Sequence, residues 1–274
     1  MQSNLTQPSF TSLTYALRGR TALITFTTPD NLNAITETRL AELEAALALA
    51  EADQQLGALV ISGGDGTSFC VGLDLALLDR AFADIAYFGS VVRRLNGIIT
   101  RIEALPIPTI AAINGYARAG GFELPLGCDF ILVADEASIG DVHTDAGVLP
   151  ATASLRLKRR IGEQRAKELI WSARWLKGQQ AVDCGLAWKS VPRADLLDTA
   201  LRMAASFTDK PRACIASNKA VFQQGEELGT AAGAALEIGL FVSYMAGQPY
   251  GREGYNAYRE KRLPAWKLAS INLA

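Results

Sequence analysis

Two segments of the sequence carry side chains that can move protons, and the first is built around Glu123. Gly120 and Gly121 precede this glutamate where we expect a helix to begin, so their unpaired N–H groups could stabilise an oxyanion. The apolar neighbours Phe122 and Leu124 should raise the pKa of Glu123 toward a range useful for proton transfer. A glutamate at a helix N-terminus is also a common structural feature, and this segment by itself favours that simpler interpretation.

The second segment contains His143, the one histidine of the chain, between Asp141 and Asp145. An imidazole titrates near neutral pH and a neighbouring carboxylate can orient it, so this group suits acid–base catalysis. A hydrogen-bonded loop histidine without a catalytic role is the simpler alternative. One histidine without further ligands at metal-binding spacing does not indicate a zinc site, and no nucleophile elbow accompanies it.

A glycine-rich segment at 62–74 follows the apolar run at 57–62 and lets the backbone turn tightly beside a ligand. It lacks the Lys-Ser/Thr of a P-loop and the glycine spacing of a dinucleotide site. The cysteines lie far apart without a Cys-x-x-Cys pair, which fits free thiols in a reducing compartment. They are Cys70, Cys128, Cys184 and Cys214.

These segments need a framework of strands and helices to bring them together. Apolar or β-branched runs predict strands at 20–27, 57–62, 109–113 and 129–134. Helical patterns lie between and after them, at 37–52, 84–104, 120–126, 152–159 and 163–172. The alternation predicts an α/β fold with parallel sheets and chemistry at the strand ends.

Beyond residue 195 the strand signals stop, and helices are expected at 196–207, 212–225, 227–246 and 252–262. We therefore divide the chain into a core, 1–195, and a helical extension, 196–274, which together form one functional unit. No linker long enough to separate two independent domains is visible.

Composition excludes several classes of protein. The chain has 274 residues, 49% hydrophobic, and 27 basic against 28 acidic side chains, so a disordered chain or a general nucleic-acid binder is disfavoured. The first ten residues carry no basic residue and no apolar core run, so we expect no secretory signal. The longest uncharged runs are broken by Pro or Gly, which predicts no membrane span and a cytoplasmic location.

Six motifs in this order and spacing resemble the crotonase (enoyl-CoA hydratase/isomerase) superfamily over residues 12–266. They are Asn33-Ala34, the segment 63–74, Pro108–Gly115, Gly120–Leu124 with Cys128-Asp129, Gly147–Pro150, and Arg252–Gly254 with Glu260–Pro264. The resemblance implies β-β-α turns in a right-handed spiral, closed by C-terminal helices. It also implies a homotrimer or a homohexamer, with the extension 196–274 as the trimerisation region.

The resemblance further implies an acyl-CoA thioester as substrate and no cofactor or metal. By motif position, the backbone N–H groups of Val71 and Gly120 would form the oxyanion hole. The CoA moiety would lie along Cys70, Gly72, Leu73 and Asp74. Lys261 and the adjacent Arg262 would be partners for its phosphates. The expected pocket walls include residues 75–95, which contain Phe82, Tyr87 and Phe88.

The sequence departs from the family at the catalytic pair. Hydratases share the proton work between two glutamates twenty residues apart; Glu123 matches the first, and His143 occupies the second position. Members that resemble 6-oxocamphor hydrolase carry a histidine near this place and cleave C–C bonds, but the aspartate expected after Pro150 is missing from the loop 151–154. Ala119 replaces the first of three usual glycines.

We therefore interpret the chain as an enoyl-CoA hydratase-like lyase, with Glu123 and His143 as the catalytic residues and Asp141 or Asp145 orienting the imidazole. Double-bond isomerisation and hydrolysis of a β-dicarbonyl compound are alternatives that use the same residues. A non-catalytic acyl-CoA-binding protein is a third, suggested by the missing second glutamate and the altered 151–154 loop.

Overall fold

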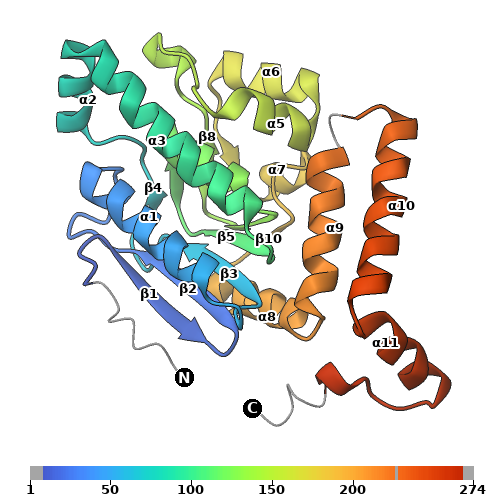
Figure 1. Ribbon diagram of the computed structural model, residues 1–274. Helices are drawn as coiled ribbons and strands as arrows, with labels where there is room; N and C mark the ends of the chain where they lie inside the picture. The colour runs from blue at the N-terminus through green and yellow to red at the C-terminus, as the bar shows by residue number, and fades with distance from the viewer. Residues whose placement is uncertain (1–8, 226–227, 268–274) are drawn as a thin grey trace.

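The computed structural model describes residues 9–225 and 228–267 (Figure 1). Residues 1–8 and 268–274, at the outer ends of the predicted core and extension, lie outside the described residues. Within the described part, two sheets and the helices around them build a mixed α/β fold, as the sequence predicts.

The larger sheet has six strands in the order β1-β2-β3-β5-β7-β10, all parallel except for the antiparallel β1–β2 pair. Its strands are β1 (Leu13–Arg18), β2 (Thr21–Phe26), β3 (Ala58–Ser62), β5 (Thr109–Ile113), β7 (Phe130–Ala134) and β10 (Lys189–Val191). The smaller sheet has the order β4-β6-β8-β9. Its strands are β4 (Ser68–Cys70), β6 (Tyr116–Arg118), β8 (Ser138–Gly140) and β9 (Leu176–Lys177).

Successive turns of the chain each give one strand to each sheet and then a helical segment. The pairs β3–β4, β5–β6 and β7–β8 are followed by α2 (Leu75–Ala83) with α3 (Ile85–Ala104), by α4 (Gly120–Glu123) with a 3₁₀ turn, and by α5 (Ala153–Ile161). This order confirms the β-β-α repeat that the family resemblance implies. Because β4, β6 and β8 lie side by side, the segments that follow them meet at one end of the smaller sheet.

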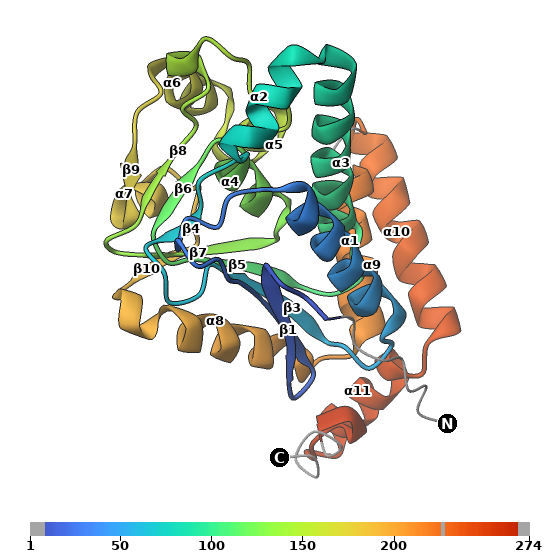
Figure 2. The same cartoon turned by 90° about the vertical axis from the view of Figure 1, so that its left-hand side faces the viewer.

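Helices cover both faces of the larger sheet (Figure 2). The helix α1 (Glu37–Ala52) begins at Thr36, whose hydroxyl accepts a hydrogen bond from the Arg39 N–H. Its buried leucines face the core at the predicted helical spacing. The helix α8 (Arg193–Thr208) packs on the opposite face, against β2, β3, β5 and β7. The remaining helices of the core are α6 (Glu163–Ser172) and α7 (Gly178–Asp183).

Two sequence predictions differ from the structure. The expected helix 120–126 is interrupted: α4 ends at Glu123, and Leu124–Gly127 forms a 3₁₀ turn, because Pro125 cannot donate the hydrogen bond of a continuing α-helix. The individual strands of the second sheet were not predicted, since they are only two or three residues long and too short to show a period.

The C-terminal region is helical, as predicted, with α9 (Arg212–Gly225), α10 (Thr230–Gly247) and α11 (Tyr250–Arg259). A partly buried ion pair joins α9 to the core: Lys219 Nζ lies 2.7 Å from Asp129 Oδ2. In contrast, α10 contacts only α9 and α11 closely and has no buried residue (Figure 1). By length and composition alone, Thr230–Gly247 could also cross a membrane, which the sequence prediction did not anticipate.

Candidate active site

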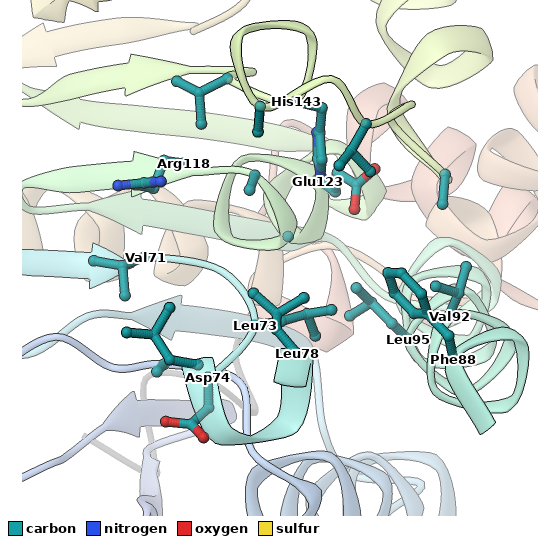
Figure 3. Close-up of a pocket in the computed structure, with 18 of the residues that line it drawn as sticks. Val71, Leu73, Asp74, Leu78, Phe88, Val92, Leu95, Arg118, Glu123 and His143 are labelled. Carbon is teal, nitrogen blue, oxygen red and sulfur yellow. The ribbon is translucent and has the colours of Figure 1, made fainter. Parts of the chain in front are cut away.

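A cavity of about 690 Å³ opens where the segments after β4, β6 and β8 converge (Figure 3). Its lining contains the two predicted proton-transfer residues, Glu123 and His143, together with backbone from both predicted oxyanion segments. Phe82 and Phe88 line it as predicted, but Tyr87 does not. The Tyr87 hydroxyl is instead bound to the Glu37 carboxylate on the neighbouring helix.

Glu123 is held at the end of α4 with only 2% of its surface exposed. Its Oε1 accepts one hydrogen bond, from the Thr152 N–H at 2.9 Å. Burial raises the pKa of the Glu123 carboxyl, although the Thr152 N–H and the nearby His143 partly offset this effect. The carboxylate therefore has the environment of a proton acceptor, which a merely structural glutamate in a helix N-terminus does not need.

His143 lies next to Glu123 in the cavity lining, and Figure 3 shows its ring beside the Glu123 carboxylate. Its Nδ1 lies 2.7 Å from Oδ1 of Asp141, a fully buried carboxylate that can only accept; Nδ1 therefore carries the proton, and Nε2 is left for a ligand. Burial alone would lower the pKa of His143, but the hydrogen bond and charge of Asp141, with a contribution from Glu123, raise it.

The structure also decides between the two aspartates that flank the histidine. Asp141 accepts hydrogen bonds from both the ring and the backbone N–H of His143. Asp145 is exposed in the short 3₁₀ turn Thr144–Ala146 and makes no hydrogen bond with His143. Its predicted supporting role is therefore wrong in this arrangement, because the turn carries its side chain outward to solvent.

The prediction that Val71 donates to the oxyanion needs correction. Its N–H already donates to the Leu32 carbonyl at 3.2 Å, so it is not available to a substrate. Two residues later, the Leu73 N–H has no partner among the described residues, and neither has the Gly120 N–H at the start of α4. Both residues line the cavity. The free pair of donors is thus Leu73 and Gly120, and Val71 contributes only its side chain.

Close approach of two loops brings these donors together. Gly72 has φ +94°, and a side chain there would meet the Ala119 methyl group and the Gly120 N–H. Ala119 itself adopts φ 49° and ψ −124°, a region that glycine occupies far more readily. The segment that holds Gly120 is therefore strained, and the strain lies directly beside the predicted oxyanion site.

Such an arrangement can polarise a carbonyl with two backbone donors while a carboxylate and an imidazole exchange protons nearby. The sequence profile of the enoyl-CoA hydratase/isomerase family matches residues 18–269. The chain belongs to this family. It is an enzyme of the hydratase/isomerase type, with the crotonase fold.

Individual members of the family are similar along nearly the whole chain. A probable mitochondrial enoyl-CoA hydratase of Dictyostelium discoideum is 31% identical over 94% of this chain and 91% of that protein. The mitochondrial methylglutaconyl-CoA hydratase of Mus musculus is 33% identical over 86% of this chain and 76% of that protein. Among solved structures, DspI of Pseudomonas aeruginosa has a TM-score of 0.89 at 29% identity, over 96% of this chain and 99% of that chain.

The predicted CoA-binding residues fall into two groups. Cys70 to Asp74 border the cavity or pack beside it: the Cys70 thiol is fully buried, with a pKa raised to about 11, and Asp74 caps α2 through two backbone N–H groups. Lys261 lies in the turn after α11 and does not line the cavity, and Arg262 is paired with Glu253 and Glu260. Their contact with CoA stays a prediction.

Three features of the site were not predicted from the sequence. The Leu73 N–H is one, and the Thr152 N–H that binds Glu123 is another; the substituted loop 151–154 thus has a positioning role. Arg118 is the third: it is exposed and lines the cavity, and its side chain makes no hydrogen bond or ion pair with the described residues. Its place next to the family's Gly-Gly motif was the available signal, since the following Ala119 was already noted as a departure.

Proposed function

We propose that this enzyme adds water across the double bond of a trans-2-enoyl-CoA thioester. The observation that carries the proposal is the convergence of Glu123, His143 and the free N–H groups of Leu73 and Gly120 on one cavity. Membership of the family supports the acyl-CoA substrate. The thioester is the substrate, and the proposed chemistry uses no resident cofactor or metal.

In the proposed mechanism, Leu73 and Gly120 donate hydrogen bonds to the thioester oxygen and stabilise the negative charge that develops there. The ionised Glu123 accepts a proton from water as the water oxygen bonds to the β-carbon. His143, protonated through its pairing with Asp141, donates the Nε2 proton to the α-carbon of the resulting enolate. Transfer of the proton from Glu123 to His143 restores both groups, and the net reaction adds one water.

The enzyme would thus replace the second glutamate of the family pair by a His143–Asp141 dyad. The raised pKa of His143 supports this assignment because an imidazolium is needed to protonate carbon. Isomerisation would require the same residues but no water, and hydrolysis of a β-dicarbonyl compound would release a carboxylic acid. Analysis of the products distinguishes these three reactions.

The test is loss of the conjugated enoyl-thioester absorbance in the wild type, Glu123→Gln and His143→Ala. We expect hydration by the wild type and a loss of about 10²- to 10⁴-fold in kcat in each variant. If Glu123→Gln left turnover of every acyl-CoA unchanged, the mechanism would be wrong. A wild type that binds CoA esters but hydrates none would favour the isomerase or hydrolase reaction, or the non-catalytic alternative.

We also propose that a second copy of this chain covers α10, in a homotrimer or homohexamer. Ile238, Phe241, Val242 and Met245 are between 44% and 63% exposed, and their spacing places them on one face of the helix. A face of this kind on a soluble protein indicates an interface. Sedimentation of Phe241→Asp should show smaller species than the wild type; a wild type that sediments as a monomer would contradict the proposal.

A cytoplasmic location is part of the proposal. The four free cysteines support a reducing compartment. The relatives from Dictyostelium and mouse described above are named as mitochondrial proteins, so the compartment differs within the family. Fractionation of the source cells, with activity toward enoyl-CoA as the marker, tests the location.

A further inference from the structure

Beyond Glu123, the cavity continues as an apolar arm that the proposed mechanism does not use. Figure 3 shows Phe88, Val92 and Leu95 of α3 on one side of Glu123, and Arg118 with Val71 on the other. The three α3 residues follow the i, i+4, i+7 spacing of one helix face. At 1.5 Å per residue, they form a continuous apolar wall about 10 Å long.

The arm offers no positive charge to a substrate. Further apolar side chains of the cavity lining, from α2 and from the loop before α5, are Leu78, Phe82, Val148, Leu149 and Ala151. Among the described residues that line the cavity, Arg118 is the one lysine or arginine, and it lies across Glu123 from the arm. A carboxylate at the far end of an acyl chain would therefore lose its hydration without gaining a partner.

The cavity has large apolar side chains that are exposed to solvent. Leu75, Phe82 and Leu149 all line the cavity, yet they are 77%, 59% and 85% exposed. The Phe82 ring packs edge-on against Phe88, with centroids 5.5 Å apart, so the apolar wall of α3 continues onto this rim. Large apolar side chains around a cavity mouth indicate a surface that an apolar ligand covers.

We propose that the substrate is an enoyl-CoA of medium or long chain, whose acyl chain lies along α3 and leaves the protein between Phe82 and Leu149. Short chains would leave the arm empty, and acyl groups with a terminal carboxylate would be disfavoured. The inference rests on the proposed function, because it places an acyl-CoA thioester at Glu123. It adds the class of acyl group, which membership of the family does not give.

Binding of saturated acyl-CoAs, measured by calorimetry, tests the inference without any turnover. The probes are butyryl-, octanoyl- and dodecanoyl-CoA, with free CoA as the reference. Burial of each added methylene should tighten binding about threefold to fourfold until the chain reaches the rim, after which the gain should fall. Equal affinity for all three chain lengths would overturn the inference and leave the proposed function intact. Failure of every CoA ester to bind would overturn both.

Pentanoyl-CoA and glutaryl-CoA form a matched pair that differs only in the terminal carboxylate. We expect glutaryl-CoA to bind at least tenfold more weakly, by the general cost of desolvating an unpaired charge. If glutaryl-CoA binds more tightly, the inference is wrong and Arg118 becomes the contact for an acyl carboxylate. Loss of that preference in Arg118→Gln would then establish the alternative.

Variants in the arm test where the acyl chain lies. Val92→Phe should shorten the arm, and Phe82→Ser should weaken its rim; both should lower the ratio of dodecanoyl- to butyryl-CoA affinity at least tenfold. Leu17→Ser removes a leucine of similar exposure from the edge strand β1, away from the cavity, and should leave the ratio unchanged. An unchanged ratio in both folded arm variants would overturn the path along α3.

Discussion

The two walls of the catalytic cavity raise the pKa of their proton-transfer groups in different ways. On the α4 wall, burial is the main cause, and Glu123 accepts a hydrogen bond from the Thr152 N–H. On the neighbouring wall that carries His143, burial acts against the shift, and the buried carboxylate of Asp141 holds the proton on His143. The first wall makes a carboxylate more basic, and the second keeps a larger fraction of the imidazole protonated at neutral pH.

This difference shows how a histidine can replace a glutamate at one position of a conjugate pair. A buried glutamate needs only an apolar site, whereas a buried histidine would lose its proton without a negative partner. The partner here is two residues away in the chain and is completely buried, with Oδ2 unpaired among the described residues. The raised pKa of His143 therefore depends on a second residue, Asp141.

The largest expected effect tests whether the two walls act as one unit. Because the mechanism needs both proton transfers in each turnover, Glu123→Gln combined with His143→Ala should lose about 10²- to 10⁴-fold in kcat, little more than the worse single variant. Steady-state kinetics on all three variants provides the measurement. Losses that multiply would show that the walls act independently.

Asp141→Asn should weaken the His143 wall alone. Without the carboxylate, the pKa of His143 should fall by about 1 to 3 pH units, and activity above that pKa should fall about tenfold per unit. Since the chain has one histidine, its imidazole proton resonance can be titrated by NMR without assignment once any affinity tag is removed. Asp145→Asn is the matched control and should leave the titration unchanged; a pKa that moves only in this variant would contradict the assignment.

Ala119→Gly should release the strain beneath the α4 wall. The φ of 49° and ψ of −124° cost an alanine about 1–3 kcal/mol, and the added freedom of glycine in the unfolded chain removes part of the gain. We expect a net increase of about 1 kcal/mol in the free energy of unfolding, measured with denaturant. Ala173→Gly, at φ 50° and ψ 22°, is the control and should gain less. A destabilised Ala119→Gly would show that the methyl contact with Gly72 outweighs the strain.

The smallest expected effect is on the pH dependence of stability. The folded pKa values of Glu123 and His143 are both raised, so the folded state holds more protons than the unfolded state, and each contribution is lost as pH rises. The two pH ranges over which this stability is lost begin near the ordinary pKa values, about 4.3 for Glu and 6.5 for His. Stability curves of Glu123→Gln and His143→Ala, each subtracted from the wild type, should isolate these ranges. A difference that grew with pH would contradict the sign of the shift.

Much of this arrangement could be predicted from the sequence. The helix α1 buries one face, so its apolar residues recur at helical spacing. The strands β3 and β5 are buried on both faces, so each is a continuous apolar run. The proximity of Glu123 and His143 follows from the family spacing, which places them on successive turns of the chain. The short strands of the second sheet have too few residues to show a period, although they position both groups.

The identity of the second oxyanion donor could not be predicted in the same way. Val71 and Leu73 are both apolar and lie in the same glycine-containing segment, so residue type does not distinguish them. The choice depends on which N–H the Leu32 carbonyl satisfies, and Leu32 lies about forty positions earlier in the chain. The choice of Asp141 over Asp145 likewise depends on the direction of a three-residue turn, which composition does not specify.

The position of α10 in the chain has a consequence for biosynthesis. The ribosome releases residues in order, and domains generally fold as they emerge, so all strands of both sheets leave the exit tunnel before Thr230. The core can therefore close around its apolar residues before the uncovered face of α10 exists. The nascent chain therefore exposes the apolar face of α10 only after the core has folded, which shortens the time during which that face could cause aggregation.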